Sequence, residues 1–162
     1  MQLIFTSPSQ LKEWGAQLAA QLQGGEILAV SGVLGAGKTT LAAGIASGLG
    51  VKSRVNSPTF NLLKIYPGGT KFCRWFCHID AYRLQKAEEL LAIGIEDYWG
   101  KPSTITFIEW AEKIQTILPP NTIKIQLAIL GARKRQLKIE NFFAKKKAQA
   151  ERRPPQLNSR PN

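Results

Sequence analysis

The sequence predicts an α/β domain in which helices and a mixed, mainly parallel sheet form three layers. Residues 26–32 are a short, nearly all-apolar run ahead of a glycine-rich turn and a helical pattern, which is typical of a strand buried in a parallel sheet. Residues 103–110 form a second apolar run that ends near an acid. Residues 58–66 and 70–80 are strand-like runs joined by the turn 67–69, and they predict an antiparallel hairpin.

The remaining elements follow from capping and periodicity. Ser7 is followed by Pro8 and, three positions after the serine, by Gln10, a pattern that marks a helix start with an N-cap and a capping-box partner. Apolar residues then recur at helical spacing up to the glycine pair 24–25. Further helices are predicted at 39–50, 87–94 and 111–118, and a closing antiparallel strand pair at 122–130 and 136–142.

The charge of the chain is concentrated near its C-terminus. The 162 residues carry 22 Lys and Arg and 11 Asp and Glu, a formal net charge of +11. From Gly131 onward ten bases stand against two acids, which accounts for +8 of that total. We therefore predict one domain over residues 1–142 and a basic, disordered tail over 143–162, because the tail is too polar and proline-rich to pack. Such a tail could contact RNA or only keep the protein in solution.

Composition argues against a membrane protein and against a zinc site. No apolar run approaches the roughly 20 residues of a spanning helix, and the N-terminus lacks a basic segment ahead of an apolar stretch, so we expect a cytoplasmic protein without membrane contact. Cys73, Cys77 and His78 lie close together, but zinc usually takes four ligands from two spaced pairs. Buried, reduced thiols are the prediction for both cysteines.

The glycine-rich turn contains a motif typical of phosphate binding. Residues 32–39 match G-x-x-x-x-G-K-[ST] in full, and glycines let the backbone wrap a phosphate with its N–H groups pointing inward. The N-terminus of the following helix favours an anion. Lys38 would bring positive charge to the β- and γ-phosphates, and the Thr39 hydroxyl is placed to ligate Mg²⁺. With a strand before it and a helix after it, this P-loop predicts a P-loop NTPase-like fold that binds ATP or a close relative.

Two acids could complete such a site. Glu109 follows the apolar run 105–108, and Asp80 ends the run 72–79. A P-loop needs an acid at the end of a neighbouring strand to organise the metal and its waters. Each acid could instead be a plain strand-end cap, but the pair together with the P-loop favours the functional interpretation.

Two neighbouring features are open to two interpretations. Trp110, beside Glu109, could stack on a nucleotide base or pack against the sheet, and packing is the default for tryptophan at a strand end. Ser57, Pro58 and Thr59 precede a predicted strand, where they could form a switch-like loop that senses the γ-phosphate or an ordinary turn.

The order and spacing of several motifs resemble one family. The segments GVLGAGKTT, VNSPTF, HIDAYRL, EELLAIGIEDYW and FIEW are similar to those of the bacterial TsaE (YjeE) family, over about residues 5–133. This family is the small P-loop ATPase of tRNA threonylcarbamoyladenosine biosynthesis. The resemblance implies a slow, Mg²⁺-dependent ATPase that works with TsaB- and TsaD-like partners, which transfer a threonylcarbamoyl group to the adenosine beside the anticodon of ANN-decoding tRNAs. Any contact with tRNA would be indirect or through the basic tail.

The resemblance also implies residue roles. Lys38, Asp80 and Glu109 would be catalytic, with Asp80 positioning water or metal. Thr39 and Glu109 would be the Mg²⁺ ligands, Thr59 the switch residue, and Arg133 a contact in the corner that closes over the nucleotide base. The residues implied to hold the nucleotide phosphates are Leu34, Gly35, Ala36, Gly37, Lys38, Thr39 and Thr40.

Two departures from the family pattern and two alternatives qualify this hypothesis. The family commonly has an acid at the position of Val33, although the backbone cradle does not need that side chain, and the basic tail exceeds the family pattern. A small P-loop kinase is one alternative, but between the P-loop and Glu109 the arginines are scattered and form no lid-like insertion. A non-catalytic, nucleotide-gated RNA-binding module is the other alternative.

Overall fold

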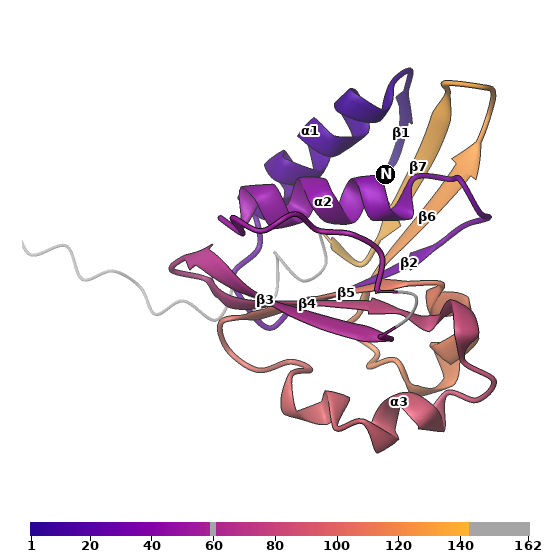
Figure 1. The fold of residues 1–162 in the computed structure, drawn as a ribbon. Helices are drawn as coiled ribbons and strands as arrows, with labels where there is room; N and C mark the ends of the chain where they lie inside the picture. Colours follow the sequence, from indigo (N-terminus) through magenta and orange to yellow (C-terminus); the bar gives the residue numbers. More distant parts are fainter. Residues whose placement is uncertain (59–60, 143–162) are drawn as a thin grey trace, which may run out of the picture.

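A seven-stranded sheet lies at the centre of the fold, with the strand order β1-β7-β6-β2-β5-β4-β3 (Figure 1). The computed structural model describes residues 1–58 and 61–142. The strands are β1 (Gln2–Phe5), β2 (Ile27–Ser31), β3 (Leu63–Thr70), β4 (Cys73–Asp80), β5 (Thr104–Glu109), β6 (Ile123–Ile129) and β7 (Arg135–Glu140). Strand β2 pairs in parallel with β5 and β6, and β4 in parallel with β5. The outer pairs β1/β7, β6/β7 and β3/β4 are antiparallel, so the predicted mixed sheet, parallel at its centre, is confirmed.

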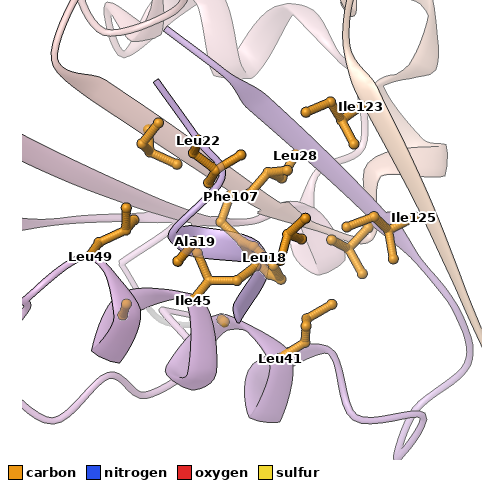
Figure 2. Close-up of a cluster of buried hydrophobic side chains, with 14 of the residues drawn as sticks. Leu18, Ala19, Leu22, Leu28, Leu41, Ile45, Leu49, Phe107, Ile123 and Ile125 are labelled. Atoms are coloured by element: carbon orange, nitrogen blue, oxygen red, sulfur yellow. The ribbon is translucent and has the colours of Figure 1, made fainter. Parts of the chain in front are cut away.

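Two helices, α1 (Pro8–Ala19) and α2 (Lys38–Gly48), cover one face of the sheet (Figure 1). The predicted N-cap is present, because the Ser7 side chain accepts a hydrogen bond from the Gln10 backbone N–H. The Gln10 side chain accepts from the backbone N–H of Thr6, at 2.8 Å, and not from that of Ser7 as a capping box requires. The helices pack closely: a Cβ on Gly44 of α2 would lie 2.2 Å from the Lys12 carbonyl oxygen. Figure 2 shows the resulting core, which contains Leu18, Leu22, Leu41, Ile45, Leu28, Phe107 and Ile125.

The opposite face is covered by shorter segments, which complete the three layers (Figure 1). They are α3 (Glu88–Ala92), η1 (Ala81–Arg83), η2 (Ile95–Asp97) and η3 (Ala111–Ile117). Leu90, Ile95 and Ile114 pack there against Ile79 and Ile108 of the sheet. Throughout the described residues, no helix has both the length and the apolar character to span a membrane.

The segment predicted as a helix at 111–118 is a 3₁₀ segment with a break at Ile114, where φ is −122° and ψ is 20°. It begins after Trp110, whose backbone is left-handed (φ 58°), and ends just before Pro119. The short stretch between the left-handed Trp110 and Pro119 favours isolated 3₁₀ turns over a regular α-helix.

The hairpin is present, but the predicted position of its turn was wrong. Residues 67–69 belong to β3, and the chain reverses at 71–72 instead. Gly69 allows a close approach: its N–H donates to the Leu49 carbonyl oxygen at 2.8 Å, and a Cβ there would lie 2.9 Å from the Gly50 oxygen. Gly69 and Gly50 therefore allow the hairpin to pack closely against the C-terminal end of α2.

Strand β1 was not predicted, because its four residues have little pattern of their own and pair with β7, 130 or more residues away. The predicted closing pair β6/β7 is confirmed. The predicted basic tail, 143–162, lies outside the described residues and stays a prediction.

Both cysteines are buried free thiols, as predicted. Removal from water disfavours the thiolate, and burial raises the pKa of Cys73 to about 11 and that of Cys77 to about 12. No group of three or more His, Cys, Asp or Glu side chains suited to a metal occurs in the part of the chain that the structure describes.

We expect both thiols to resist alkylation in the native protein at pH 8 and to react once the protein is unfolded in urea. Because their pKa values in the fold lie above the ordinary 9.0, the unfolded chain releases these protons first. The free energy of unfolding should therefore fall as the pH rises above about 9. Urea titrations from pH 8 to 10.5 would measure this, and the Cys73→Ala, Cys77→Ala protein should show a flatter slope. Rapid labelling of the native protein would contradict the prediction.

Candidate functional site

The P-loop and the two predicted acids meet at one edge of the sheet. Strands β2, β4 and β5 are parallel, so their carboxyl ends lie together. Asp80 and Glu109 are the last residues of β4 and β5, and they stand directly opposite each other in the register. The P-loop follows β2, beside β5. This edge is where open α/β sheets bind their ligands.

Glycines give the P-loop its path. Gly32 leaves β2 with φ 143°, and a Cβ there would lie 2.5 Å from the Leu127 carbonyl oxygen of β6. Gly37 is the N-cap of α2 in the left-handed conformation, with φ 104°. A Cβ on Gly37 would lie 2.8 Å from the Leu11 side chain. The loop is therefore packed between β6 and α1 at positions that admit only glycine.

Lys38 is held inside the loop. Its Nζ donates to the carbonyl oxygens of Gly32 at 2.6 Å and Val33 at 3.1 Å, and lies 3.7 Å from the centroid of the Trp110 ring. The residue is only 5% exposed. Desolvation lowers the pKa of Lys38 below its ordinary value, although the carboxylates of Glu109, Glu112 and Asp80 act in the opposite direction. The lysine is thus a weakly hydrated cation, suited to bind an anion tightly.

Thr39 and Glu109 are in direct contact across the site. The Thr39 hydroxyl lies 2.9 and 3.1 Å from the two carboxylate oxygens of Glu109. The same carboxylate is held from behind, because His78 Nε2 lies 2.8 Å from Glu109 Oε1. His78 is fully buried, with the Phe107 ring edge-on at 5.6 Å between centroids. The carboxylate therefore has a fixed orientation before any ligand binds.

Asp80 is oriented by its own neighbours. Its Oδ1 accepts the Tyr82 backbone N–H at 3.0 Å, and its Oδ2 accepts the Ser57 hydroxyl. Ser57 is the first residue of the segment predicted as a switch or a turn, and its hydroxyl is in contact with the acid. Thr59, the predicted switch residue, lies outside the described residues.

A cavity of about 480 Å³ joins these groups. Of the predicted site residues, Leu34, Gly35, Gly37, Lys38, Thr39, Thr40, Asp80 and Glu109 line it. Ala36 belongs to the loop but is fully buried, so it contributes backbone only. Arg133 is exposed in the turn between β6 and β7 and is not among the lining residues, so its contact with the base stays a prediction. Trp110 is half-buried and covers Lys38.

Two side chains at the site have roles that sequence patterns did not reveal. His78 supports Glu109, although the sequence suggested only a weak metal cluster with the cysteines. Arg135 donates from Nε and Nη2 to the Gly35 carbonyl oxygen at 3.3 and 3.1 Å. Its only signal was its place in a basic stretch, and the two residues are 100 positions apart.

Comparison with known proteins agrees with the geometry. The family model described as "Threonylcarbamoyl adenosine biosynthesis protein TsaE" matches residues 5–137. The chain belongs to the TsaE family. It is 32% identical over 140 residues to the TsaE of Treponema pallidum, covering 86% of this chain and 99% of that protein. It is 34% identical over 131 residues to the TsaE of Bacillus subtilis, covering 81% and 79%. The crystal structure of YdiB from Bacillus subtilis superposes with a TM-score of 0.74 at 26% identity, covering 94% of each chain. The resemblance to the TsaE family and the fold class predicted from motifs are both confirmed.

Proposed function

We propose that this TsaE-family protein binds and hydrolyses ATP as a factor in tRNA threonylcarbamoyladenosine biosynthesis. The observation that carries the proposal is the convergence of Lys38, Thr39, Asp80 and Glu109 on one cavity beside the P-loop. A strand-end acid next to the P-loop hydroxyl is the arrangement that phosphoryl-transfer sites use to organise a metal.

The residues fit Mg²⁺. This ion prefers oxygen ligands and usually takes one or two from the protein, with waters and phosphate oxygens as the rest. The Thr39 hydroxyl and the Glu109 carboxylate are adjacent oxygen donors, and His78 orients the carboxylate. When bound, Mg²⁺ would neutralise charge on the β- and γ-phosphates. We assign Thr39 and Glu109 to hold it.

The other residues bind and orient the reactants. The P-loop N–H groups and the N-terminus of α2 hold the phosphates, and Lys38 places its charge on the β/γ bridge. Trp110 shields the Lys38 ammonium from water on one side, which strengthens its interaction with phosphate. Asp80, fixed by Ser57 and Tyr82, orients the attacking water. Water would form the new bond to the γ-phosphorus as the bond from that phosphorus to the β/γ bridging oxygen breaks, so the products are ADP and phosphate, and the proton of the attacking water is released to phosphate or solvent.

Family membership supports TsaB- and TsaD-like proteins as the partners. In this proposal, those partners carry out transfer of the threonylcarbamoyl group to adenosine in ANN-decoding tRNAs, and this protein supplies the ATP-driven step. Its place of action would be the cytoplasm.

ATP hydrolysis by the purified protein, with and without its TsaB- and TsaD-like partners, tests the proposal. We expect slow Mg²⁺-dependent phosphate release that the partner pair accelerates, and no release in EDTA. Transfer of the γ-phosphate to a nucleoside instead of water would favour a small kinase. A protein truncated after residue 142 provides a further comparison. If this truncation greatly weakened tRNA binding and reduced its dependence on salt, and if the full-length protein hydrolysed no ATP, the non-catalytic RNA-binding alternative would be favoured.

A further inference from the structure

The P-loop is supported from outside by one arginine. Arg135, the first residue of β7, is half-buried. Its guanidinium donates two hydrogen bonds to the Gly35 carbonyl oxygen, at 3.3 and 3.1 Å. The remaining Nη1 donates to carbonyl oxygens of the β6–β7 turn, those of Gly131 at 2.9 Å, Lys134 at 3.2 Å and Ala132 at 3.4 Å. One side chain thus joins the P-loop to the β6–β7 turn.

These bonds act on a part of the P-loop with little other support. A Cβ built on Gly35, where φ is 78°, would have no atom of a described residue within 4 Å apart from its two chain neighbours, and Leu34 beside it is 81% exposed. Side-chain packing therefore does not hold the crest of the loop. The Gly35 carbonyl is instead held by the Arg135 guanidinium.

The support reaches the phosphate-binding lysine through a chain of hydrogen bonds. In the peptide group between Gly35 and Ala36, the oxygen is held by Arg135, and the Ala36 N–H donates to the Val33 carbonyl oxygen at 3.1 Å. That same Val33 oxygen accepts from Lys38 Nζ at 3.1 Å. Arg135 is thereby connected to Lys38 through two peptide groups, and the described hydrogen bonds include none between the two side chains.

The positive charge of Arg135 also favours binding of phosphate at the loop. Among the described residues its guanidinium has no carboxylate partner, since the ion pairs found there are His78 with Glu109 and Lys138 with Glu140. An uncompensated cation at the rim of a phosphate site raises the local positive potential. The planar fork that bonds Gly35 twice is a geometry that lysine cannot reproduce.

We propose that Arg135 is a positioning residue of the phosphate-binding loop, which fixes the Gly35–Ala36 peptide and, through its bond to the Val33 carbonyl oxygen, the path of the loop around Lys38. The proposal deepens the proposed function, since it assumes that the loop binds a nucleotide. It assigns Arg135 to the phosphate half of the ligand and not to the base.

Three variants test it: Arg135→Ala, Arg135→Lys and, as a control, Lys134→Ala. The Lys134 side chain is exposed in the same turn, carries the same charge, and makes no hydrogen bond or ion pair among the described residues. Thermal unfolding would first establish that each variant is folded. The measurements are amide hydrogen exchange of residues 32–37 without nucleotide, and the dissociation constants of ATP and of inorganic tripolyphosphate with Mg²⁺.

For Arg135→Ala we expect about tenfold faster exchange in the loop and about tenfold weaker binding of both ligands, because bonds from a charged donor are lost. Arg135→Lys should recover part of the affinity, and Lys134→Ala should change neither measurement more than about twofold. Equal effects of Arg135→Ala and Lys134→Ala would overturn the proposal, because charge alone would then explain them. Weaker binding of ATP with unchanged tripolyphosphate binding would also overturn it, because Arg135 would then contact the nucleoside.

The exchange measurement separates this proposal from the proposed function. If the wild-type protein bound neither ligand, the ATPase proposal would fail. Faster loop exchange confined to the Arg135 variants would still support the positioning role, and unchanged exchange would refute it.

Discussion

Replacement of Lys38 by alanine is expected to lower ATP turnover by about 10²- to 10³-fold, the range for losing one group that stabilises developing charge. Lys38 is 5% exposed and surrounded by Gly32, Val33 and Trp110, so its charge acts in a poorly hydrated place. The fold should survive, because the substitution removes a cation whose burial lowers its pKa and therefore costs free energy in the folded state.

Steady-state hydrolysis and ATP binding would be measured for Lys38→Ala beside Lys38→Met, which keeps the apolar stem against Trp110. Lys101→Ala is the matched control. Lys101 is exposed and lies just before β5, at the end of that strand opposite to Glu109. Turnover in Lys38→Ala equal to that of the Lys101 variant would contradict the assigned role. Intact tRNA modification in cells carrying only Lys38→Ala would argue against the proposed pathway function.

Replacement of Glu109 by glutamine is expected to weaken Mg²⁺-dependent turnover by at least about 10- to 100-fold, the loss typical of removing an outer-shell partner of a metal ligand, because Glu109 is assigned as a ligand itself. The amide keeps the shape of the side chain and can still contact Thr39, but it lacks the negative charge that attracts the ion. Glu109 is 3% exposed and contacts both Thr39 and His78, so its carboxylate is held in one position in the site.

Titration of turnover with Mg²⁺ separates a metal effect from a general loss. For Glu109→Gln we expect a shift of the curve to higher Mg²⁺, with ATP binding in EDTA unchanged. Glu96→Gln serves as the control, because Glu96 is an exposed acid in η2 and is not among the carboxylates that act on Lys38. Asp80→Ala should instead lower turnover at saturating Mg²⁺, if Asp80 orients water. An unchanged Mg²⁺ dependence in Glu109→Gln would rule out its assignment as a ligand.

The local parts of this site follow from short-range physics. A glycine pattern between a buried strand and a helix predicts a phosphate-binding turn, and the structure has the expected strand, loop and helix in that order. The apolar runs ending at or near Asp80 and Glu109 locate two strand ends, and parallel strands bring such ends to one edge. Residue type and spacing were sufficient for these predictions, because backbone conformation depends mainly on neighbours in the chain.

Contacts between distant segments could not be predicted in the same way. The bond between Arg135 and Gly35 depends on β7 folding back beside β6, and the support of Glu109 by His78 depends on the register of β4 against β5. The turn expected at 67–69 lies inside β3 for a similar reason, since Gly69 approaches the end of α2.

The sequence by itself determined the glycine-rich loop between strand and helix, the strand-end acids, the α/β class and the family. Capping, periodicity and glycine placement are local, so one chain is enough to read them. Only the tertiary structure decided which side chains orient Glu109 and the P-loop. A buried histidine and a half-buried arginine have no distinctive local pattern, because their partners are chosen by the order and register of strands far apart in the chain.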